Sequence, residues 1–375
     1  MRFVKVPLLD LQAQFQQIRS EVLAAIEEVC HEQRFILGQR VEAFETAIAE
    51  YLECRYAVGV ASGSDALLLS LMAAGVKPGD EVITVPFTFF STAGGISRLY
   101  ATPVFVDVRA DTLTIDPEQI ERKITPRTKA IIPVHLFGQC ADMECIMELA
   151  ERRGITVIED ACQSIGASRR GRKSGTFGHS GCFSFFPSKN LGGVGDGGLI
   201  VTDDGDLREL LLALRVHGSR SDYHHDHIGL NSRLDALEAA VLRVKLQYLD
   251  GWNAQRARNA ANYDRLLTEA GLLDHVTLPV TDPNNVHVFN QYTLRAQNRD
   301  ELMAYLREQE IGHKVYYPVP LHLQECYQPL GYAKGDLPVS EQLAREVLSL
   351  PVYPELTDVQ MESVVTRISE FYNAR

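Results

Sequence analysis

Hydrophobic and polar positions along the first two thirds of the chain follow two alternating patterns. Seven short runs rich in β-branched residues have the character of buried strands. They are residues 56–62, 81–87, 102–108, 129–137, 155–161, 181–186 and 197–202. Segments with helical spacing lie between several of them, including residues 65–75 and 143–154. This alternation predicts crossover units on a mostly parallel sheet, and so an α/β fold.

A long helical pattern over residues 234–267 follows these runs and predicts a link to a second unit. Beyond it, residues 288–296 and 301–317 suggest strand and helix elements, and residues 316–322 (YYPVPLH) a loop stiffened by prolines. We therefore predict a large α/β domain over residues 1–250 and a smaller α+β domain over residues 251–375. The N-terminal segment could pack on the small domain.

Composition limits the classes of partner. The chain has 375 residues, 45% of them hydrophobic and 23% charged, which is typical of a globular protein. A net charge of -12 argues against nucleic-acid binding, which needs a basic face, and favours a small ligand. The seven scattered cysteines form no C-x-x-C pair. Since no run has the pattern of a secretion signal or of a membrane span, we expect a soluble, cytoplasmic protein with free thiols.

The stretch FSFFPSKNLGGVGDGG, residues 183–198, places Lys189 between an aromatic run and a glycine-rich loop. A lysine on an exposed turn is the simplest interpretation, but a lysine walled in by aromatic side chains suggests chemistry. Gly193, Gly195 and Gly198 match G-x-G-x-x-G. A dinucleotide fingerprint opens a helix, whereas these glycines lead into a strand, so we reject a nucleotide site of that kind. Glycines here indicate a tight bend or a close approach to a ligand.

Other candidates follow strands, where an open α/β sheet binds its ligands. Asp160 ends one run, and its carboxylate could hold a heterocyclic nitrogen protonated while Gln163 bonds a neighbouring oxygen. Helix capping is an equally simple role for Asp160. Gly63 and Ser64 open an apolar helix whose amides could bind an anion, although ordinary capping by Ser62 or Ser64 would explain the pattern.

Phe89, after the run 81–87, could stack on a flat ring or belong to the core. Taken together, the candidates require a ligand with an anionic group, a flat ring, a ring nitrogen and an aldehyde within reach of Lys189. Pyridoxal 5'-phosphate has all four features.

The chain resembles the sugar aminotransferases of the DegT/StrS group, which have the aspartate aminotransferase fold (fold type I) of pyridoxal-phosphate enzymes. The resemblance extends almost end to end. It rests on the segments PLLDLQAQF, FILGQRVEAFE, SGSDAL, PGDEVI, PFTFFST, TPRTKAIIPVHLFGQCADM, VIEDACQSIGA, SFFPSKNLGGVGDGG, NSRLDALEAAVLRVKL, YYPVPLH and LSLPVYP. It implies a mostly parallel seven-stranded sheet in the large domain.

The resemblance also implies roles for single residues. Lys189 would form the internal aldimine with the cofactor, Asp160 would pair with its pyridinium nitrogen and Gln163 would contact the ring hydroxyl. Further cofactor contacts implied in this way are Phe89 on the ring, Ser184 with the amides of Gly63 and Ser64 on the phosphate, and Asn231 on the phosphate of the neighbouring subunit. The expected assembly is thus a homodimer with shared active sites, in which Arg233 supports the loop of Asn231.

The implied substrates are an amino-acid donor, expected to be L-glutamate, and a nucleotide-linked keto-sugar. Members with a Y-H-H…G-x-N-S-R-L-D segment aminate the 3-keto position of a dTDP-deoxysugar or of a UDP-linked uronic acid derivative. Here the segment is DYHHDHIGLNSRLD, so Tyr223 and His224 lie in a loop that either faces substrate or is solvated. A metal site at His224, His225 and His227 is a weaker interpretation, because the loop lacks helical spacing and thiols.

Other candidate substrate contacts are Tyr316, Tyr317 and His322, with Phe35 as either a wall of the pocket or a core aromatic. Tyr316 stands where some relatives have histidine, which weakens the transfer of their sugar preference. The basic run 169–175 (RRGRKSG) predicts a glycine-centred turn between strands, and we assign it no function.

Two other functions stay open. Some relatives without the lysine carry out dehydration, although Lys189 argues against that. A regulatory sugar-binding protein could also have this fold.

Overall fold

The computed structural model describes residues 5–221 and 223–374. A seven-stranded sheet dominates the large domain, in the order β1-β9-β8-β5-β4-β2-β3. Only β9 among these seven strands runs antiparallel to its neighbours β1 and β8. The strands are β1 (Tyr56–Val60), β2 (Glu81–Thr84), β3 (Thr102–Phe105), β4 (Thr128–Ile131), β5 (Thr156–Asp160), β8 (Ser180–Ser184) and β9 (Gly198–Thr202). Each overlaps a run expected to form a strand, with β4 and β8 beginning one residue earlier, so the predicted α/β sheet is confirmed.

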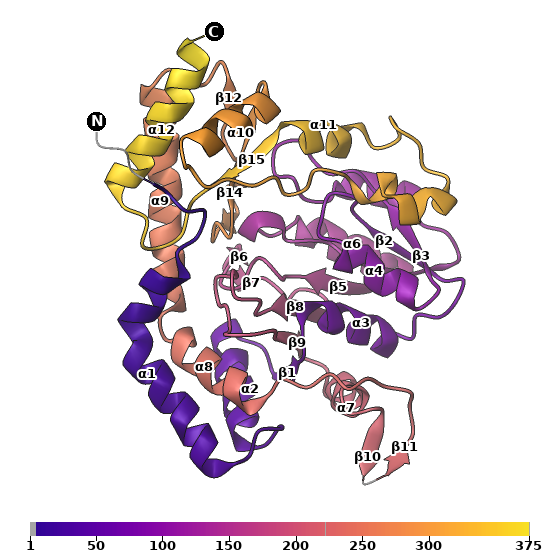
Figure 1. The fold of residues 1–375 in the computed structure, drawn as a ribbon. Coiled ribbons are helices and arrows are strands. Elements are labelled where there is room, and N and C mark those ends of the chain that lie inside the picture. The colour runs from indigo at the N-terminus through magenta and orange to yellow at the C-terminus, as the bar shows by residue number, and fades with distance from the viewer. Residues whose placement is uncertain (1–4, 222, 375) are drawn as a thin grey trace.

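Helices cover both faces of this sheet (Figure 1). Alternate residues of each strand point to opposite faces, and both sets are apolar, so both faces have to be covered. Val58 and Val60 pack with α3 and α7, whereas Ala57 packs with α2 and α8. The covering helices are α2 (Gln39–Leu52), α3 (Gly63–Ala73), α4 (Ser91–Arg98), α6 (Met143–Arg153), α7 (Gly205–Leu214) and α8 (Ala236–Leu246). The continuous burial of the strands explains why their sequences are apolar rather than alternating.

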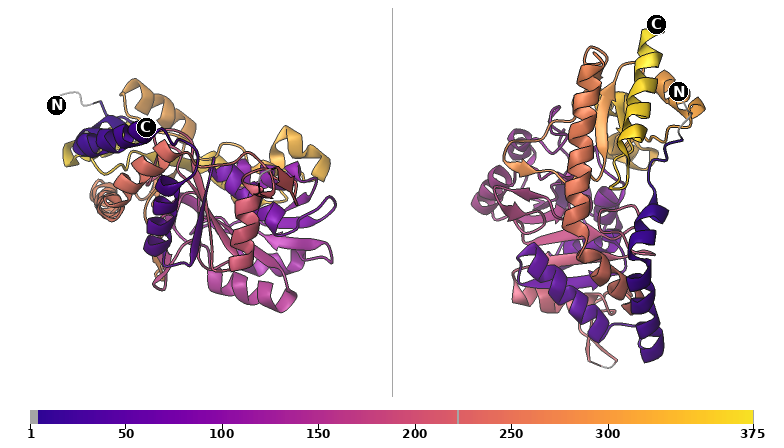
Figure 2. Two further views of the ribbon diagram at one scale, coloured as in Figure 1. Left: turned by 90° about the horizontal axis from the view of Figure 1, so that it is seen from below. Right: turned by 90° about the vertical axis from the view of Figure 1, so that its left-hand side faces the viewer.

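The smaller unit is built on an antiparallel sheet in the order β12-β14-β15. Its elements are α9 (Leu249–Glu269), β12 (Val276–Thr277), β14 (Tyr292–Ala296), α10 (Arg299–Glu308), β15 (Val347–Leu350) and α12 (Asp358–Asn373). The helical pattern over 234–267 forms two helices, because α8 ends at Leu246 and α9 begins at Leu249. In Figure 2, α9 is the long helix that connects the two units.

The N-terminal part contains a helix that the sequence patterns did not indicate, α1 (Leu11–Glu32), which packs against α8. Ahead of it, Val6 is buried and pairs with Ile311 of the small unit. Conversely, a helix from the C-terminal part of the chain, α11 (Pro338–Glu346), packs onto the core of the large unit. The chain therefore crosses between the units several times, and a boundary at residue 250 stays a prediction.

The remaining elements are short. They are α5 (Pro117–Ile120), η1 (Glu121–Lys123), η2 (Leu136–Gly138), β6 (Ser168–Arg169), β7 (Arg172–Lys173), β10 (Ser219–Ser221), β11 (His224–His225), β13 (Asn285–Val286), η3 (Leu321–Leu323) and η4 (Glu325–Leu330). The run 169–175 forms the expected glycine-centred turn, because Arg170 and Gly171 join β6 to β7 with positive φ. No helix among the described residues is long and apolar enough to cross a membrane.

Candidate active site

Asp160 ends β5 at the carboxyl edge of the parallel strands and is 6% exposed. Its Oδ2 accepts a hydrogen bond of 2.7 Å from the Thr92 hydroxyl, and its Oδ1 accepts one of 3.3 Å from the Cys162 amide. Thr92 lies in the first turn of α4, and its hydroxyl is 3.0 Å from that of Thr88. These contacts fix the carboxylate in position without a basic partner among them.

Lys189 lies in the turn that follows β8, where its amide donates to the Phe186 carbonyl at 2.8 Å. It is partly buried. Burial lowers the pKa of its ammonium, and the negative charge of the Asp160 carboxylate opposes this shift. The Cys162 thiol stays protonated, because burial raises its pKa well above the ordinary value. The structure thus brings Lys189 and Asp160 together and favours a neutral amine more than water does.

The glycine loop after Lys189 packs against α8. The buried Glu238 of that helix accepts the Val194 amide at 3.0 Å, and the buried Lys245 donates to the Gly192 carbonyl at 2.7 Å. A Cβ at Gly193 would overlap Oε2 of Glu238. No glycine of this loop has a positive φ. Gly193 and Gly195 therefore allow a close approach, but the group that they approach is a protein carboxylate rather than the ligand that the sequence suggested.

A possible anion site lies at the N-terminus of α3. The Ser62 side chain caps the helix by accepting the Asp65 amide, as one of the sequence interpretations expected. Among the described residues, the amides of Gly63 and Ser64 have no acceptor. A Cβ at Gly63 would lie 2.7 Å from Cβ of Ser184. Gly63 thus brings the helix start against Ser184, and the two amides and a hydroxyl can bind one anion.

Gln163 and the aromatic residues form a further part of the site. The Gln163 carbonyl accepts the Phe137 amide at 2.8 Å, and its amide nitrogen donates to the Tyr317 hydroxyl at 3.1 Å. The Tyr317 ring centroid lies 6.3 Å from that of Phe89. Phe89 is 56% exposed, which excludes the core role considered from its sequence. The amide of Gln163 thus already has protein partners at both ends, and Phe89 presents an open face.

These residues fit pyridoxal phosphate. They offer an amine of lowered pKa, a buried carboxylate, two free helix amides, and an exposed ring. Gly63 leaves space that any Cβ would fill.

Comparison with known proteins assigns the family. The model of the DegT/DnrJ/EryC1/StrS aminotransferase family matches residues 16–369. The chain belongs to this aminotransferase family. The resemblance noted in the sequence is therefore confirmed.

Three relatives of this DegT/DnrJ/EryC1/StrS protein span nearly its whole length. A "Pleiotropic regulatory protein" of Geobacillus stearothermophilus is 52% identical over 98% of this chain and 99% of its own. A dTDP-3-amino-3,4,6-trideoxy-alpha-D-glucose transaminase of Streptomyces venezuelae is 45% identical, covering 98% and 96%. A UDP-N-acetyl-3-dehydro-alpha-D-glucosamine 3-aminotransferase of Acidithiobacillus ferrooxidans is also 45% identical, covering 97% of each chain.

Solved structures support the fold. S. venezuelae DesV in complex with a ketimine intermediate has a TM-score of 0.94 at 45% identity, covering 98% of each chain. NtdA of Bacillus subtilis with the bound cofactor PMP has a TM-score of 0.89 at 32% identity, covering 99% of this chain and 86% of that one. The fold class expected from the resemblance is confirmed.

The candidates for contacts with the substrate or with a partner subunit are spread along the chain of this family member. Several of them are exposed. Asn231 is exposed in the loop before α8, and Arg233 is partly buried. Phe35 is 37% exposed, and its carbonyl accepts the Ala236 amide at 2.9 Å, so it is not a core aromatic. Tyr223 is 95% exposed next to His224, in the hairpin of β10 and β11 that projects from the large unit (Figure 1).

Of the last two candidates, Tyr316 lies on the loop before η3 and His322 lies within η3. Tyr316 is partly buried and adjoins Tyr317. His322 is 1% exposed, with Nε2 3.2 Å from Oε1 of Glu341, so its imidazole is enclosed by protein. Their roles as substrate contacts stay predictions. In the described part of the chain, no group of three or more His, Cys, Asp or Glu side chains could hold a metal ion.

Several residues that support the site had no distinguishing signal of their own in the sequence. Thr92 and Cys162 hydrogen bond Asp160, and Glu238 holds the glycine loop. Thr92 lies three residues after Phe89, and Cys162 lies between Asp160 and Gln163, so closeness in the sequence to these candidates was an available signal. Glu238 is more than 40 residues from the loop it holds, and only the fold brings them together.

Proposed function

We propose that this protein is a pyridoxal-phosphate-dependent aminotransferase that moves an amino group from L-glutamate to the 3-keto position of a nucleotide-linked sugar. One observation carries the proposal. Lys189, with a lowered pKa, lies close enough to the Asp160 carboxylate for the two charges to interact, at the carboxyl edge of the sheet. Few structural roles require a partly buried lysine of lowered pKa beside a buried carboxylate.

Bound pyridoxal phosphate supplies an aldehyde and an electron-withdrawing ring. In the proposal, Asp160 holds a proton at the ring nitrogen, and Thr92 with the Cys162 amide orients the carboxylate. Lys189 carries the cofactor and, as a neutral amine, moves a proton at the substrate carbon. Ser184 and the amides of Gly63 and Ser64 bind the phosphate. Phe89 stacks on the ring, and Gln163 faces the ring hydroxyl beside Tyr317.

For the acceptor we propose a dTDP-linked 3-keto-deoxysugar. The two transaminases above, one named for a dTDP sugar and one for a UDP sugar, are equally similar to this chain. Both names place the nitrogen at position 3 of the sugar, so they support amination at that position. They support the choice of dTDP over UDP less strongly, because the two names differ in the nucleotide. A UDP-linked 3-keto uronic acid and a 4-keto-sugar are the alternatives, and Tyr223, His224, Tyr316, Tyr317 and His322 are the proposed sugar or nucleotide contacts.

We further propose a homodimer in which Asn231 and Arg233 serve the partner's site. Asn231 is exposed within one chain, as a residue that acts on a partner has to be. Apolar side chains are also exposed on nearby segments: Ile36 at 56%, Val194 at 55% and Ile228 at 91%. Burying them in a dimer would remove apolar surface from water.

The reaction is tested in two half-steps. The purified protein is incubated with pyridoxal phosphate, its visible absorption is recorded, and L-glutamate is added. We expect glutamate to bleach the band and a dTDP-linked 3-keto-sugar to restore it, with UDP-linked and 4-keto sugars compared in parallel. Lys189→Arg is the control, because arginine keeps the charge but cannot carry the cofactor. A wild-type band that glutamate leaves unchanged would refute the activity.

Shared sites are tested by mixing two inactive variants, Lys189→Ala and Asn231→Ala. If each site takes Lys189 from one chain and Asn231 from the other, a mixed dimer has one intact site. Random mixing then restores about a quarter of wild-type activity. No recovery, from subunits shown to exchange, would refute the shared site.

A regulatory sugar-binding role is the second candidate, and the name of the Geobacillus relative favours it. It predicts nucleotide-sugar binding without bleaching by any amino acid. The first half-step separates the two functions.

A further inference from the structure

Asn190 follows Lys189 directly, and its side chain is almost completely buried, at 3% exposure. The side-chain amide uses every hydrogen-bonding group it has. Its Nδ2 donates to Oδ1 of Asn253 at 2.6 Å and to the Val288 carbonyl at 3.0 Å, and its Oδ1 accepts from Nδ2 of Asn290 at 2.8 Å. A buried amide with all its partners in place holds its residue firmly, since breaking any of these bonds leaves a buried polar group without a partner.

The partners of Asn190 belong to two distant parts of the chain. Asn253 lies on α9, where its Nδ2 also donates to the Ile165 carbonyl at 3.1 Å. Asn290 and Val288 lie on the segment 280–291, which we call the strap. Both Asn253 and Asn290 are buried. Asn190, Asn253 and Asn290, the amide triad, therefore join the lysine turn to the linking helix and to the strap.

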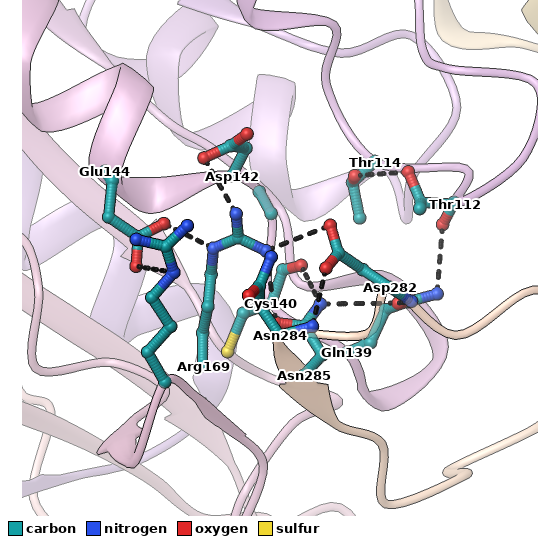
Figure 3. Close-up of polar contacts among 12 residues, drawn as sticks. Thr112, Thr114, Gln139, Cys140, Asp142, Glu144, Arg169, Asp282, Asn284 and Asn285 are labelled. Carbon is teal, nitrogen blue, oxygen red and sulfur yellow. Dashed lines mark hydrogen bonds and ion pairs between the residues drawn. The ribbon is translucent and has the colours of Figure 1, made fainter.

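The far end of the strap is bound to the large unit by a separate cluster (Figure 3). There, Asn285 donates to the Cys140 carbonyl at 2.8 Å and to Oε1 of Gln139 at 3.3 Å. Arg169, which is 3% exposed, forms ion pairs with Asp142, Glu144 and Asp282. The cluster fixes the strap at one end, and the amide triad binds the other end through hydrogen bonds to Asn190.

Between these ends, the strap also contacts the loop that holds Gln163. The Val288 amide donates to the Gly138 carbonyl at 3.0 Å, and Gly138 has a φ of +114°. A Cβ there would lie 3.0 Å from the Asn290 amide nitrogen. The contact with Gly138 thus holds the strap beside the triad without the help of Asn285.

We propose that Asn190, Asn253 and Asn290 are positioning residues, which set the backbone of Lys189 relative to the cofactor site through the amide triad. The proposal rests on the proposed role of Lys189 as the amine that carries the cofactor. The Cα atoms of Lys189 and Asn190 are about 3.8 Å apart, so a displacement of Asn190 reaches Lys189 almost undiminished. A displacement of about 1 Å is enough to cost up to about 100-fold in rate.

The test compares Asn190→Ala with Asn285→Ala. Both remove an asparagine amide that holds the strap, but Asn285 lies at the far end, away from Lys189. For Asn190→Ala we expect kcat to fall by about 10- to 100-fold with little change in KM. The pKa of the lysine–cofactor linkage, read from the visible absorption, should also shift by about half a unit or more, because its protonation depends on how the lysine backbone holds it against the ring.

Asn285→Ala should lower the thermal midpoint and leave both readings at the wild-type value. If Asn190→Ala does not fold, Asn253→Ala and Asn290→Ala each remove one bond of the triad and should move both readings in the same direction by less. Readings for the triad variants equal to those of Asn285→Ala, at equal loss of stability, would overturn the proposal. Failure of the proposed function is a different result, because wild type itself would then show no band that glutamate bleaches.

Discussion

The contact between Gly193 and Glu238 predicts a large loss of stability for Gly193→Ala. The new Cβ would overlap Oε2 of Glu238 and lie 3.1 Å from its Cδ. Glu238 is 5% exposed, so its carboxylate has little free space to move into. If it does rotate away, the Val194 amide loses its 3.0 Å acceptor.

The magnitude follows from these two costs. Forcing a methyl group into a packed site costs about 1–3 kcal/mol. A buried amide without an acceptor costs about 1–3 kcal/mol more. We therefore expect Gly193→Ala to lower the free energy of unfolding by about 2–6 kcal/mol, which is a large part of the roughly 5–15 kcal/mol of a typical domain.

Gly251→Ala is the matched control. Gly251 lies in α9, and a Cβ there would meet nothing within 4 Å. The same substitution should stabilise the protein by about 0.5–1 kcal/mol, because alanine loses less backbone freedom in a helix. Urea unfolding followed by far-UV circular dichroism measures both variants. A Gly193→Ala midpoint within experimental error of wild type would refute the packing argument.

Three further predictions concern the site. Asp160→Asn should fold normally, because the Thr92 hydroxyl can turn to accept a hydrogen bond from the new amide, but its turnover should fall on the order of 100-fold. Melting curves and steady-state kinetics measure the two effects. Near-wild-type turnover would exclude the pairing of Asp160 with the cofactor. Gly63→Ala should raise the dissociation constant of pyridoxal phosphate about five- to tenfold, because the new Cβ pushes the start of α3 away from Ser184. Equilibrium titration measures this constant. An unchanged affinity would contradict the anion site. In the cofactor-free protein, Lys189→Met should stabilise at neutral pH, with an advantage over wild type that shrinks as pH rises towards 10.5. The pKa of Lys189 is lowered below that ordinary value on folding, so its unfolded form binds more protons in this range; an advantage independent of pH in urea titrations would show that Lys189 folds without such a shift.

The sequence by itself was sufficient for the sheet and for naming candidate residues at its edge. All seven expected runs form strands, because continuous apolar segments between helical patterns can only be buried within an α/β sheet. Lys189 and Asp160 were identified as candidates from local features, an amine beside glycines and a carboxylate at a strand end. Their meeting follows from topology, since both follow strands that pair with each other, β8 and β5.

Only the tertiary structure showed what these local features contact. Gly193 and Gly195 make room for Glu238, and Asn190 is held by Asn253 and Asn290, both at least 60 residues away in the chain. The exposure of Phe89 and the enclosure of His322 were equally undecidable beforehand. The physical reason is that strand and helix propensities depend on neighbours in the sequence. Buried hydrogen bonds and packing depend instead on partners that come together only when the chain has folded.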